Sequence, residues 1–503
     1  MARVWSLQEV AQHNASSSCW VVINNKVYDV TDFLPAHPGG DKIILKYAGR
    51  DATAAYEPIH PKDALDKHLP PEKHLGPLDS AGTDVLKEEQ AARRKTQDEI
   101  RVEQARARKR PINQILSLQD MEDVAHEVLS YKTWAFYRSA SDDEITYNEN
   151  RRAFSRFFFH PRVLRPVSKV DPSTTILGFS SSLPIFVSAA SLGKLGHPLG
   201  ELNITRGAGR TGIIQMISHY ASVSRQELAA ARISPSQPLF FQLYKDKDDK
   251  VSEKDLHEIE GLGFNAVFLT VDASLNGNRE RDLKAPFELE AQERLLEEAQ
   301  VAGKGEMPER PEDADNKLVE GELVLVGTSG GLRTTSDLDM SWSRTLPWLR
   351  RTTKLPIVLK GIQTVADAVM AVEAGVEGIL ISNHGVGHFA ELFCSSLPPI
   401  EVLYRIRKER PDVFDKLEVY IDCGVHRGTD VLKALCLGAR AVGLGRAFHF
   451  AQSAYGEAGV VQTVRILQRE IILGMRLLGV TSVKELVPEM IERVDWQPLL
   501  SKM

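Results

Sequence analysis

Eight short apolar segments, most of them followed by an amphipathic stretch, constrain the fold of this 503-residue chain more than any other feature. They are rich in Ile, Val, Leu and Phe, and they span residues 184–189, 212–217, 239–244, 265–272, 356–360, 378–382, 417–422 and 440–445. Helical patterns follow them, for example over residues 364–374 and 427–437. Continuous apolar strands that alternate with helices indicate a parallel sheet buried on both faces. The eight units predict an α/β fold, a closed (β/α)8 or TIM barrel rather than an open sheet.

The amino-acid composition changes at several points along the chain, and these changes predict domain boundaries. We expect a compact domain over residues 1–80, a charged linker over 81–110, the barrel over 111–490 and a tail over 491–503. Residues 81–110 hold scarcely a large apolar side chain, so they are expected to form a solvated helix or linker. Residues 284–330 interrupt the alternation with acidic, polar sequence, and we expect a long loop there, either a mobile active-site cover or disordered.

Charge and cysteine content exclude several classes of protein. Lys and Arg total 62 against 68 Asp and Glu, and this net charge of -6 gives no basic footprint for nucleic acid. No apolar run approaches the roughly eighteen residues that a membrane-spanning helix needs. Four scattered cysteines are too few for a disulfide framework or a zinc site. The N-terminus lacks a signal-peptide pattern, so we expect the cytosol, with the peroxisome as the alternative because residues 501–503 read Ser-Lys-Met.

Polar residues stand at the carboxyl ends of five of the apolar segments. They are Tyr244, Asp272, Lys360, His384 and Asp422. In a parallel barrel these ends meet on one face, where catalytic groups collect. A single buried His, Lys or Asp is more often structural, but five in register are hard to explain by core packing. The sequence therefore predicts an active site on this face.

The residue types at these ends predict a proton transfer next to a flavin. His384 is a candidate base, since an imidazole titrates near neutral pH, and Asp272 is the candidate that orients it. Lys360 supplies a positive charge suited to a reduced flavin. Gly445 and Arg446, after the last segment, offer backbone N–H groups and a guanidinium for a phosphate.

Residues 207–212 match the dinucleotide pattern Gly-x-Gly-x-x-Gly, which binds a pyrophosphate when a strand precedes it and a helix follows. Here the order is reversed, because a helical stretch precedes the motif and an apolar strand follows it. We therefore expect a helix-to-strand turn rather than a nicotinamide site.

Two histidines near the N-terminus form a second candidate site. His37 begins the sequence His-Pro-Gly-Gly, and His60 follows 23 residues later. These letters alone are compatible with a turn and a surface histidine. However, residues 4–80 resemble the cytochrome b5 family, including the stretches at 28–31 and 57–60. The resemblance implies an α+β domain in which His37 and His60 are the axial ligands of haem b.

Residues 111–490 resemble the FMN-dependent 2-hydroxy acid dehydrogenase and oxidase family. The motifs are Asp422-x-Gly424-x-x-Arg427-Gly428-Thr429-Asp430 and Ser382-Asn383-His384-Gly385. With the haem domain in front, the chain resembles the lactate-oxidising, flavocytochrome-type members. The resemblance implies that His384 is the base, Asp272 its partner and Tyr244 a third catalytic residue. It assigns FMN binding to Ser218, Gln242, Thr270, Lys360, Asp422, Arg427, Gly445 and Arg446, and substrate binding to Arg279, Tyr220, Tyr244 and His384.

The chain departs from that family at positions that hold the substrate carboxylate. The family's arginine after the catalytic histidine is Gly387 here, and a tyrosine that also contacts the carboxylate is Phe136. His426 replaces an arginine usual near the flavin phosphate, and Ser191 replaces a small apolar residue. We therefore expect the oxidation chemistry to be kept and the substrate to differ from simple lactate.

Several readings of the function remain open at this point. The leading one is an enzyme that oxidises a hydroxy compound, passes electrons from FMN to haem b and then to a soluble acceptor such as cytochrome c. In a second, His388 or Arg279 compensates and the protein is a conventional L-lactate dehydrogenase (cytochrome). Others are an electron-transfer or flavin-binding protein with a decayed active site, or an oxygen-using oxidase. The resemblance also implies a homo-oligomer, a tetramer, with neither nucleic acid nor membrane as a partner.

Overall fold

The computed structural model describes residues 3–37, 40–273, 277–302, 328, 335–385 and 396–495. Gly387, His388 and the Ser-Lys-Met end therefore lie outside the described residues. None of the helices in these ranges is long and apolar enough to cross a membrane. In the same ranges, no group of three or more His, Cys, Asp or Glu side chains is placed to hold a metal ion.

The eight predicted strands form a closed parallel barrel, so the predicted fold class is confirmed. Around the barrel the order is β10, β11, β12, β13, β14, β15, β16 and β9. The strands are β9 (Ile185–Val187), β10 (Ile214–Ile217), β11 (Leu239–Leu243), β12 (Ala266–Thr270), β13 (Ile357–Ile362), β14 (Gly378–Ile381), β15 (Glu418–Ile421) and β16 (Ala441–Leu444). Nearly all of their residues are buried, because helices cover the outside while side chains fill the inside.

The inside of the barrel is packed with large side chains rather than open. Phe186, Phe240, Phe268 and Tyr420 are the bulkiest members of this interior cluster. A hairpin of β7 (Thr174–Ile176) and β8 (Phe179–Ser181) adds Ile176 to the same cluster. The filled interior leaves the ends of the strands as the place where a ligand can bind.

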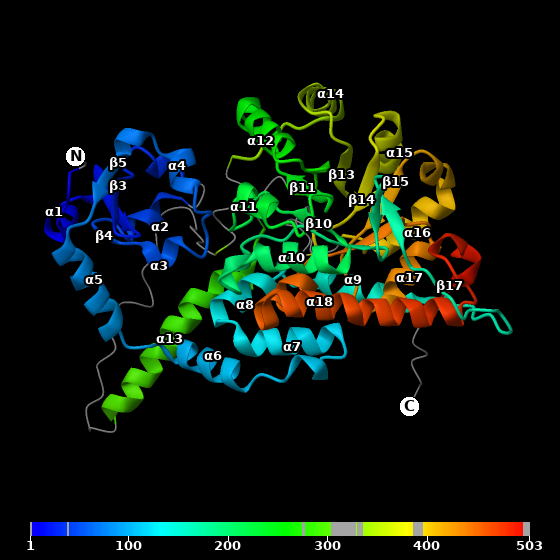
Figure 1. Ribbon diagram of the computed structural model, residues 1–503, viewed down its shortest axis with the longest axis horizontal. Coiled ribbons are helices and arrows are strands. Elements are labelled where there is room, and N and C mark those ends of the chain that lie inside the picture. Colours follow the sequence, from blue (N-terminus) through cyan, green and yellow to red (C-terminus); the bar gives the residue numbers. More distant parts are fainter. Residues whose placement is uncertain are drawn as a thin grey trace.

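Helices follow most barrel strands and form the outer layer (Figure 1). They are α10 (Glu201–Thr211), α11 (Arg225–Ala230), α12 (Asp249–Gly261), α13 (Glu280–Ala302), α14 (Trp342–Thr352), α15 (Val365–Glu373), α16 (Pro399–Glu409), α17 (Gly428–Cys436) and α18 (Arg446–Leu477). The glycine-rich motif at 207–212 is the end of α10 and its C-cap Gly212, directly before β10. The predicted helix-to-strand turn is therefore confirmed.

Three helices precede the barrel and pack on its outer layer: α7 (Leu118–Val128), α8 (Tyr131–Arg138) and α9 (Ile145–Ala153). Figure 1 shows α7 lying along α18, and α7 contributes Met121 and Val124 to a cluster with Phe450 of α18. At the other end of this part, β6 (Phe157–Phe159) pairs with β17 (Ile491–Arg493). The first residues of the expected tail thus form a strand.

The expectation of a structureless loop from Lys284 is wrong in its first part. Residues 280–302 form the helix α13, which projects downward from the barrel in Figure 1. The segment is rich in Glu, Ala, Leu and Gln, which are strong helix formers, although Pro286 lies inside it and its apolar residues follow no single face. Intrinsic propensity, which a search for apolar periodicity ignores, accounts for the helix. The next residues, 303–327, lie outside the described part of the chain.

The N-terminal unit is a small sheet with short helices around it. The strands are β1 (Asn14–Ala15), β2 (Ser18–Ile23), β3 (Lys26–Asp29), β4 (Arg50–Asp51) and β5 (His74–Pro77), and the helices are α1 (Leu7–Ala11), α2 (Asp41–Leu45), α3 (Thr53–Tyr56) and α4 (Ala64–His68). A capping box between Ser6 and Glu9 starts α1. The charged linker contains the helices α5 (Ser80–Ala92) and α6 (Gln97–Arg108), most of whose residues are exposed, as expected for a solvated segment.

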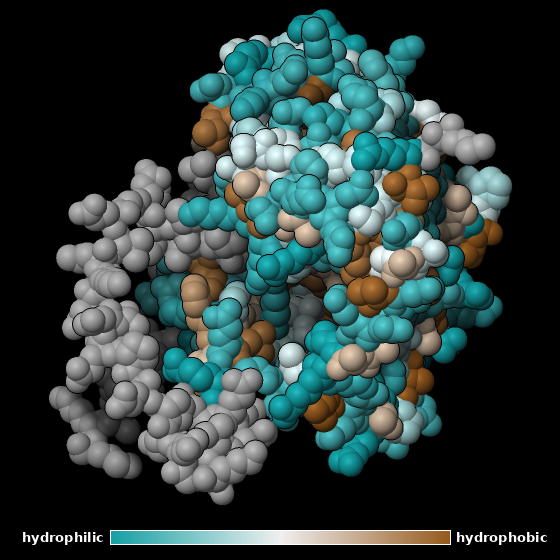
Figure 2. Space-filling view, turned by 90° about the vertical axis from the view of Figure 1, so that its left-hand side faces the viewer, coloured by the Kyte–Doolittle hydropathy of each residue, from teal (hydrophilic) through white to brown (hydrophobic). Residues whose placement is uncertain are grey.

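The N-terminal unit lies beside the barrel (Figure 1). Lys67 Nζ lies 2.8 Å from Glu258 Oε1 of α12, and Lys62 Nζ lies 3.1 Å from Glu227 Oε1 of α11. Ile59 packs against the apolar cluster that contains Phe450. Figure 2, which views the molecule from this side, shows mainly hydrophilic residues with hydrophobic ones in small separate spots. The two units therefore meet through ion pairs and a small apolar contact.

Candidate functional site

A cavity of about 760 Å³ lies where the carboxyl ends of the barrel strands meet. Ten residues predicted from the sequence line it: Ser218, Tyr220, Gln242, Tyr244, Arg279, Lys360, His384, Asp422, Gly445 and Arg446. Thr270 and Asp272 are buried behind this lining and hydrogen-bond to members of it. The structure thus brings together side chains that are up to 228 positions apart, from Ser218 to Arg446.

His384, Asp272 and Tyr244 form a hydrogen-bonded row. His384 Nδ1 lies 2.9 Å from Asp272 Oδ1, and Asp272 is fully buried. The other ring nitrogen, Nε2, lies 3.0 Å from the Tyr244 hydroxyl, which lines the cavity. A carboxylate that accepts the proton on Nδ1 leaves Nε2 free to accept one from a ligand. This geometry fits the predicted base and its orienting partner.

The backbone around His384 and Asp272 is unusual, and it places both side chains. His384 follows β14 with a φ of 62°, and its N–H donates to Ser382 Oγ at 3.1 Å. Gly361 has a φ of 111°, and a Cβ there would lie 2.4 Å from Asp272 Cβ. Only glycine leaves room for the carboxylate at this point.

Lys360 lies inside β13 rather than at its end, which corrects the sequence prediction. The strand continues to Ile362, and its register with β14 shifts between Lys360 and Ile362. A bulge of this kind changes the direction of a side chain near an active site. Lys360 Nζ lies 3.8 Å from Asp272 Oδ1.

The charge on Lys360 is maintained in spite of its burial. Burial alone would lower the pKa of the Lys360 ammonium, but Asp272 and Asp422 outweigh it and hold that pKa above its ordinary value. Lys360 therefore carries a fixed positive charge at neutral pH next to the cavity.

Ser218, Gln242 and Thr270 form a polar row over three neighbouring strands. Gln242 Nε2 donates to Thr270 Oγ1 at 2.8 Å, and the Ser218 hydroxyl donates to Gln242 Oε1 at 3.4 Å. The row supplies donors and acceptors at one edge of the cavity. It suits the polar edge of a planar heteroaromatic ring, which is the role predicted for these residues.

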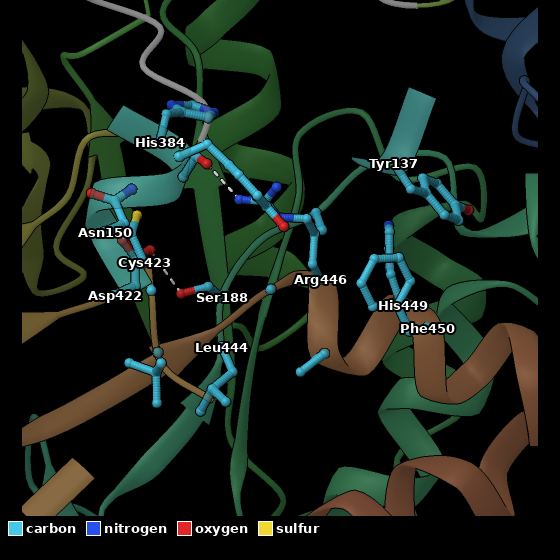
Figure 3. A pocket seen from close by; sticks show the side chains of 18 of the residues that line it. Tyr137, Asn150, Ser188, His384, Asp422, Cys423, Leu444, Arg446, His449 and Phe450 are labelled. Carbon is cyan, nitrogen blue, oxygen red and sulfur yellow. Dashed lines mark hydrogen bonds between the residues drawn. The ribbon is translucent and has the colours of Figure 1, made fainter. Parts of the chain in front are cut away.

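The opposite end of the cavity suits an anion. Asp422 Oδ2 accepts from the Ser188 hydroxyl at 3.0 Å, and Arg446 lies across the cavity from them (Figure 3). Arg446 Nη1 is buried without a hydrogen-bond partner among the described residues, and Arg446 also begins the helix α18. A buried guanidinium at a helix N-terminus favours a phosphate. With Lys360 and the polar row, this end shows that the residues present fit FMN.

Arg427 is the one predicted cofactor residue that the structure places elsewhere. Its guanidinium lies 2.8 Å from Glu470 Oε1, and the side chain is 52% exposed. It does not belong to the residues that line the cavity. The motif spacing identified the loop correctly but not the direction of this side chain.

Several lining residues were not predicted from the sequence. Ser188, Tyr147 and Arg138 line the cavity, and the guanidiniums of Arg138 and Arg446 lie 3.9 and 4.4 Å from the centre of the Tyr147 ring. Tyr147 and Arg138 come from α9 and α8, which precede the barrel. No signal at the strand ends marks such helices.

Arg279 and Phe136 lie together at the substrate end. Arg279 Nε donates to Ser139 Oγ at 2.9 Å, and its Nη2 donates to the Phe136 carbonyl oxygen. The guanidinium lies 4.9 Å from the centre of the Phe136 ring. The backbone of α8 therefore holds the arginine that faces the cavity, while Phe136 offers a ring without a hydroxyl.

His37 and His60 of the N-terminal unit face each other at a separation that fits haem. Their ring centres are 6.1 Å apart. Two imidazoles bound to one iron at about 2 Å on opposite sides have ring centres roughly 6 Å apart. His37 Nδ1 lies 2.9 Å from the Gly40 carbonyl oxygen and His60 Nδ1 3.1 Å from that of Tyr56. Both Nε2 atoms are therefore left for the metal.

Burial keeps this histidine pair neutral, as metal ligation requires. Burial lowers the pKa of His60 to about 4, and it also lowers the pKa of His37. Phe33 and Tyr56, which pack against an apolar cluster with Leu34 and Leu69, contact the rings of His37 and His60. The residues present thus fit a haem with two axial histidines.

Comparison with family models matches both parts of the chain. The model described as FMN-dependent dehydrogenase matches residues 125–493. The model described as cytochrome b5-like heme/steroid binding domain matches residues 6–79.

Individual proteins give the same result. The L-lactate dehydrogenase (cytochrome) of Wickerhamomyces anomalus is 43% identical over 486 residues, which cover 96% of this chain and 79% of that protein. Glycolate oxidase 1 of Zea mays is 37% identical, covering 75% of this chain and 95% of that protein. A solved flavocytochrome b2 variant with pyruvate bound has a TM-score of 0.67 and 39% identity, covering 81% of this chain and 95% of that one.

The haem geometry predicts the effect of removing one ligand. His60→Ala should abolish the absorbance spectrum of six-coordinate haem while FMN binding is retained, because no second imidazole then reaches the iron. The matched control is His68→Ala, which removes an exposed histidine of α4 in the same unit. An unchanged haem spectrum in His60→Ala would contradict the assignment.

The contact between His384 and Asp272 predicts a loss of rate rather than of binding. Asp272→Asn should lower the rate of flavin reduction about 100- to 10,000-fold, since an amide no longer stabilises the imidazolium. Anaerobic stopped-flow absorbance measures this rate, and FMN and haem contents report the integrity of the fold. A variant that reduces its flavin at the original rate would show that Asp272 has no role in orienting the base.

Proposed function

The chain belongs to the FMN-dependent dehydrogenase family, with a cytochrome b5-like haem domain in front, and we propose that it oxidises a small 2-hydroxy compound other than free lactate. That it is an FMN-dependent hydroxy acid dehydrogenase of the flavocytochrome b2 type follows from its relatives. The proposal concerns the substrate. The observation that carries it is an intact row of His384, Asp272 and Tyr244 beside altered contacts for a carboxylate.

The side chains of the site divide the work of oxidation among them. His384 Nε2 accepts the proton of the substrate hydroxyl, which the Tyr244 hydroxyl helps to position. Asp272 stabilises the imidazolium that results. FMN, held by the cavity residues, would supply an acceptor for the two electrons of the carbon–hydrogen bond, and haem b, held by His37 and His60, would supply a one-electron relay to a soluble acceptor such as cytochrome c. Lys360 is buried beside the cavity, and its charge would favour the electron-rich form of the cofactor.

The argument on substrate rests on the number of groups that can hold a carboxylate. Arg279 is the guanidinium at this end of the cavity, and two of its contacts are to Ser139 and Phe136. Phe136 cannot donate a hydrogen bond, and position 387 is glycine in the sequence. Loss of a buried charged hydrogen bond weakens binding by about 2–5 kcal/mol, or roughly 30- to several-thousand-fold. An ester or amide of a 2-hydroxy acid needs no such bond, so it suits this site better than the acid.

A second candidate substrate is L-lactate itself. It is favoured by the relatives at 43% and 42% identity, which are L-lactate dehydrogenases (cytochrome). In this case Arg279 or His388, which lies outside the described residues, provides the carboxylate contact. The first experiment below distinguishes the two candidates.

The contact between the two units supports transfer of electrons from the flavin to the haem. Ile59, next to the haem ligand His60, packs against a cluster that contains Leu192 and Phe450. Phe450 and Ser191, which precedes Leu192, both line the cavity. The haem ligand thus lies one apolar layer from the flavin site.

Ion pairs also connect the N-terminal unit to the barrel. Lys67 contacts Glu258, and Arg225 Nη1 lies 2.8 Å from Glu258 Oε2 and 2.6 Å from Asp255 Oδ1. His219 Nε2 lies 3.7 Å from Asp255 Oδ2, and His219 stands between the cavity residues Ser218 and Tyr220. Lys67 therefore connects the haem domain to the ion pairs of Arg225 with Asp255 and Glu258. These ion pairs lie beside His219, next to the cavity residues.

The substrate proposal predicts a preference for neutral compounds. With excess L-lactate, L-lactamide or methyl L-lactate under anaerobic conditions, flavin bleaching should be at least about tenfold more efficient for a neutral compound than for the acid. Efficient reduction at low millimolar lactate would establish the second candidate instead. Hydrogen peroxide yield in air reports whether oxygen is the acceptor.

A double substitution that restores carboxylate contacts tests the physical cause of the preference for neutral compounds. Phe136→Tyr combined with Gly387→Arg should restore two carboxylate contacts and raise the efficiency with lactate about 30-fold or more. The efficiency with lactamide should stay within a few-fold of the unmodified protein. An equal rise for both compounds would show that the variants act on something other than carboxylate binding.

The ion pair between the units predicts an effect on electron transfer alone. Lys67→Glu should slow haem reduction by the flavin about 5- to 30-fold, because it opposes Glu258, while flavin reduction by substrate is unchanged. The double variant Lys67→Glu/Glu258→Lys should recover part of the rate, because a lysine at position 258 pairs with the new glutamate but repels Arg225. The control is Lys26→Glu, an exposed lysine of β3 that belongs to none of the ion pairs described above. If Lys26→Glu slows haem reduction as much, net charge rather than the pair is responsible.

A further inference from the structure

The cavity is lined by six cationic side chains, among them Lys360, Arg152 and Arg279, and by the carboxylates of Glu122 and Asp422. Arg138, Arg151 and Arg446 line it, together with His426. Arg138 pairs with Glu144, its Nη1 lying 3.4 Å from Glu144 Oε2. Arg151 has a neutral partner in the described part of the chain, since its Nη1 donates to Gln119 Oε1 at 3.3 Å. Arg151 therefore lines the cavity as a guanidinium that is hydrogen-bonded to a neutral side chain, with Glu122 as a carboxylate in its vicinity.

The position of Arg151 is fixed by the backbone of α9. The neighbouring Asn150 exchanges two amide hydrogen bonds with Asn383, at 2.9 and 2.7 Å, and Asn383 precedes His384. Gly424, with a φ of 79°, approaches so closely that a Cβ there would lie 2.1 Å from the Asn150 carbonyl oxygen. These contacts hold α9 against the loop between β15 and α17, which carries His426.

Burial and two guanidiniums disfavour a positive charge on His426 in the absence of a bound anion. Burial first, and then the guanidiniums of Arg151 and Arg446, lower the pKa of the His426 imidazole to about 4. Without a bound anion, the side chain is therefore neutral at physiological pH. The family resemblance implies an arginine at position 426. The loop therefore lacks one cation, while Arg151 of α9 provides another.

We propose that Arg151 binds the phosphate group of FMN together with Arg446, and that the positive charge for this phosphate has moved from position 426 to α9. A phosphate dianion is best held by two planar guanidiniums, each able to donate two parallel hydrogen bonds. Arg446 provides a buried Nη1 that has no hydrogen-bond partner in the described residues, and Arg151 provides the second group. His426 adds a hydrogen-bonding imidazole close to the two guanidiniums.

The proposal is tested by comparing FMN with riboflavin, which has the same ring but no phosphate. The full chain with haem retained and FMN removed is titrated with each compound, and quenching of flavin fluorescence gives the two dissociation constants. Arg151→Gln should weaken FMN binding about 10- to 100-fold and leave riboflavin binding within about twofold. An unchanged FMN affinity, or an equal loss for both compounds, overturns the proposal.

Two further variants separate a direct contact from other causes. Arg465→Gln removes the same charge from an exposed residue of α18 that does not line the cavity. It should keep the ratio of FMN to riboflavin affinity, and a loss equal to that of Arg151→Gln would attribute the effect to net charge and overturn the proposal. Arg151→Gln/His426→Arg should recover at least about tenfold in FMN affinity. A double variant that binds FMN no more tightly than Arg151→Gln would contradict the proposed exchange of positions. Haem absorbance reports that each variant is folded.

Discussion

The hydrogen bond between His384 Nδ1 and Asp272 Oδ1 is the interaction on which the rest of the site depends. Asp272 is fully buried, and a buried carboxylate is costly unless a cation or a donor satisfies it. His384 and Lys360 supply that compensation, and Gly361 leaves the space for it. The catalytic histidine, the charged lysine and the bulge in β13 are therefore one arrangement rather than three separate features.

The two ends of the cavity have diverged from the family to different degrees. The chemistry end keeps His384, Asp272 and Tyr244 in hydrogen-bonding contact. The two proposals place changes of recognition at both flanks, where Phe136 lies beside Arg279 and His426 lies near Arg151. Exchange of a charged contact leaves the proton transfer intact, since the reacting hydroxyl lies at His384 and not at these flanks. Specificity and cofactor retention can therefore vary while the reaction is conserved.

The barrel and most of the site could be predicted because buried strands and their ends leave a signal in the sequence. Each strand is buried on both faces and so is largely apolar, and polar residues shortly after its carboxyl end, such as Asp272 and His384, contribute to the site. Arg151 and Arg138 come from helices outside the β/α repeat, so nothing in that pattern marks them. Arg427 was assigned by motif, but its side chain pairs with Glu470. Helix α13 was missed because its stability comes from residue propensity rather than from one apolar face.

The proton-accepting role of His384 is tested most directly by single-turnover reduction of the flavin without oxygen. In the unmodified protein, a 2-hydroxy compound should bleach the flavin absorbance before the haem becomes reduced. In His384→Gln the rate should fall about 100- to 10,000-fold, with haem and FMN contents unchanged. A His384→Gln protein that bleaches as fast as the original would contradict the account.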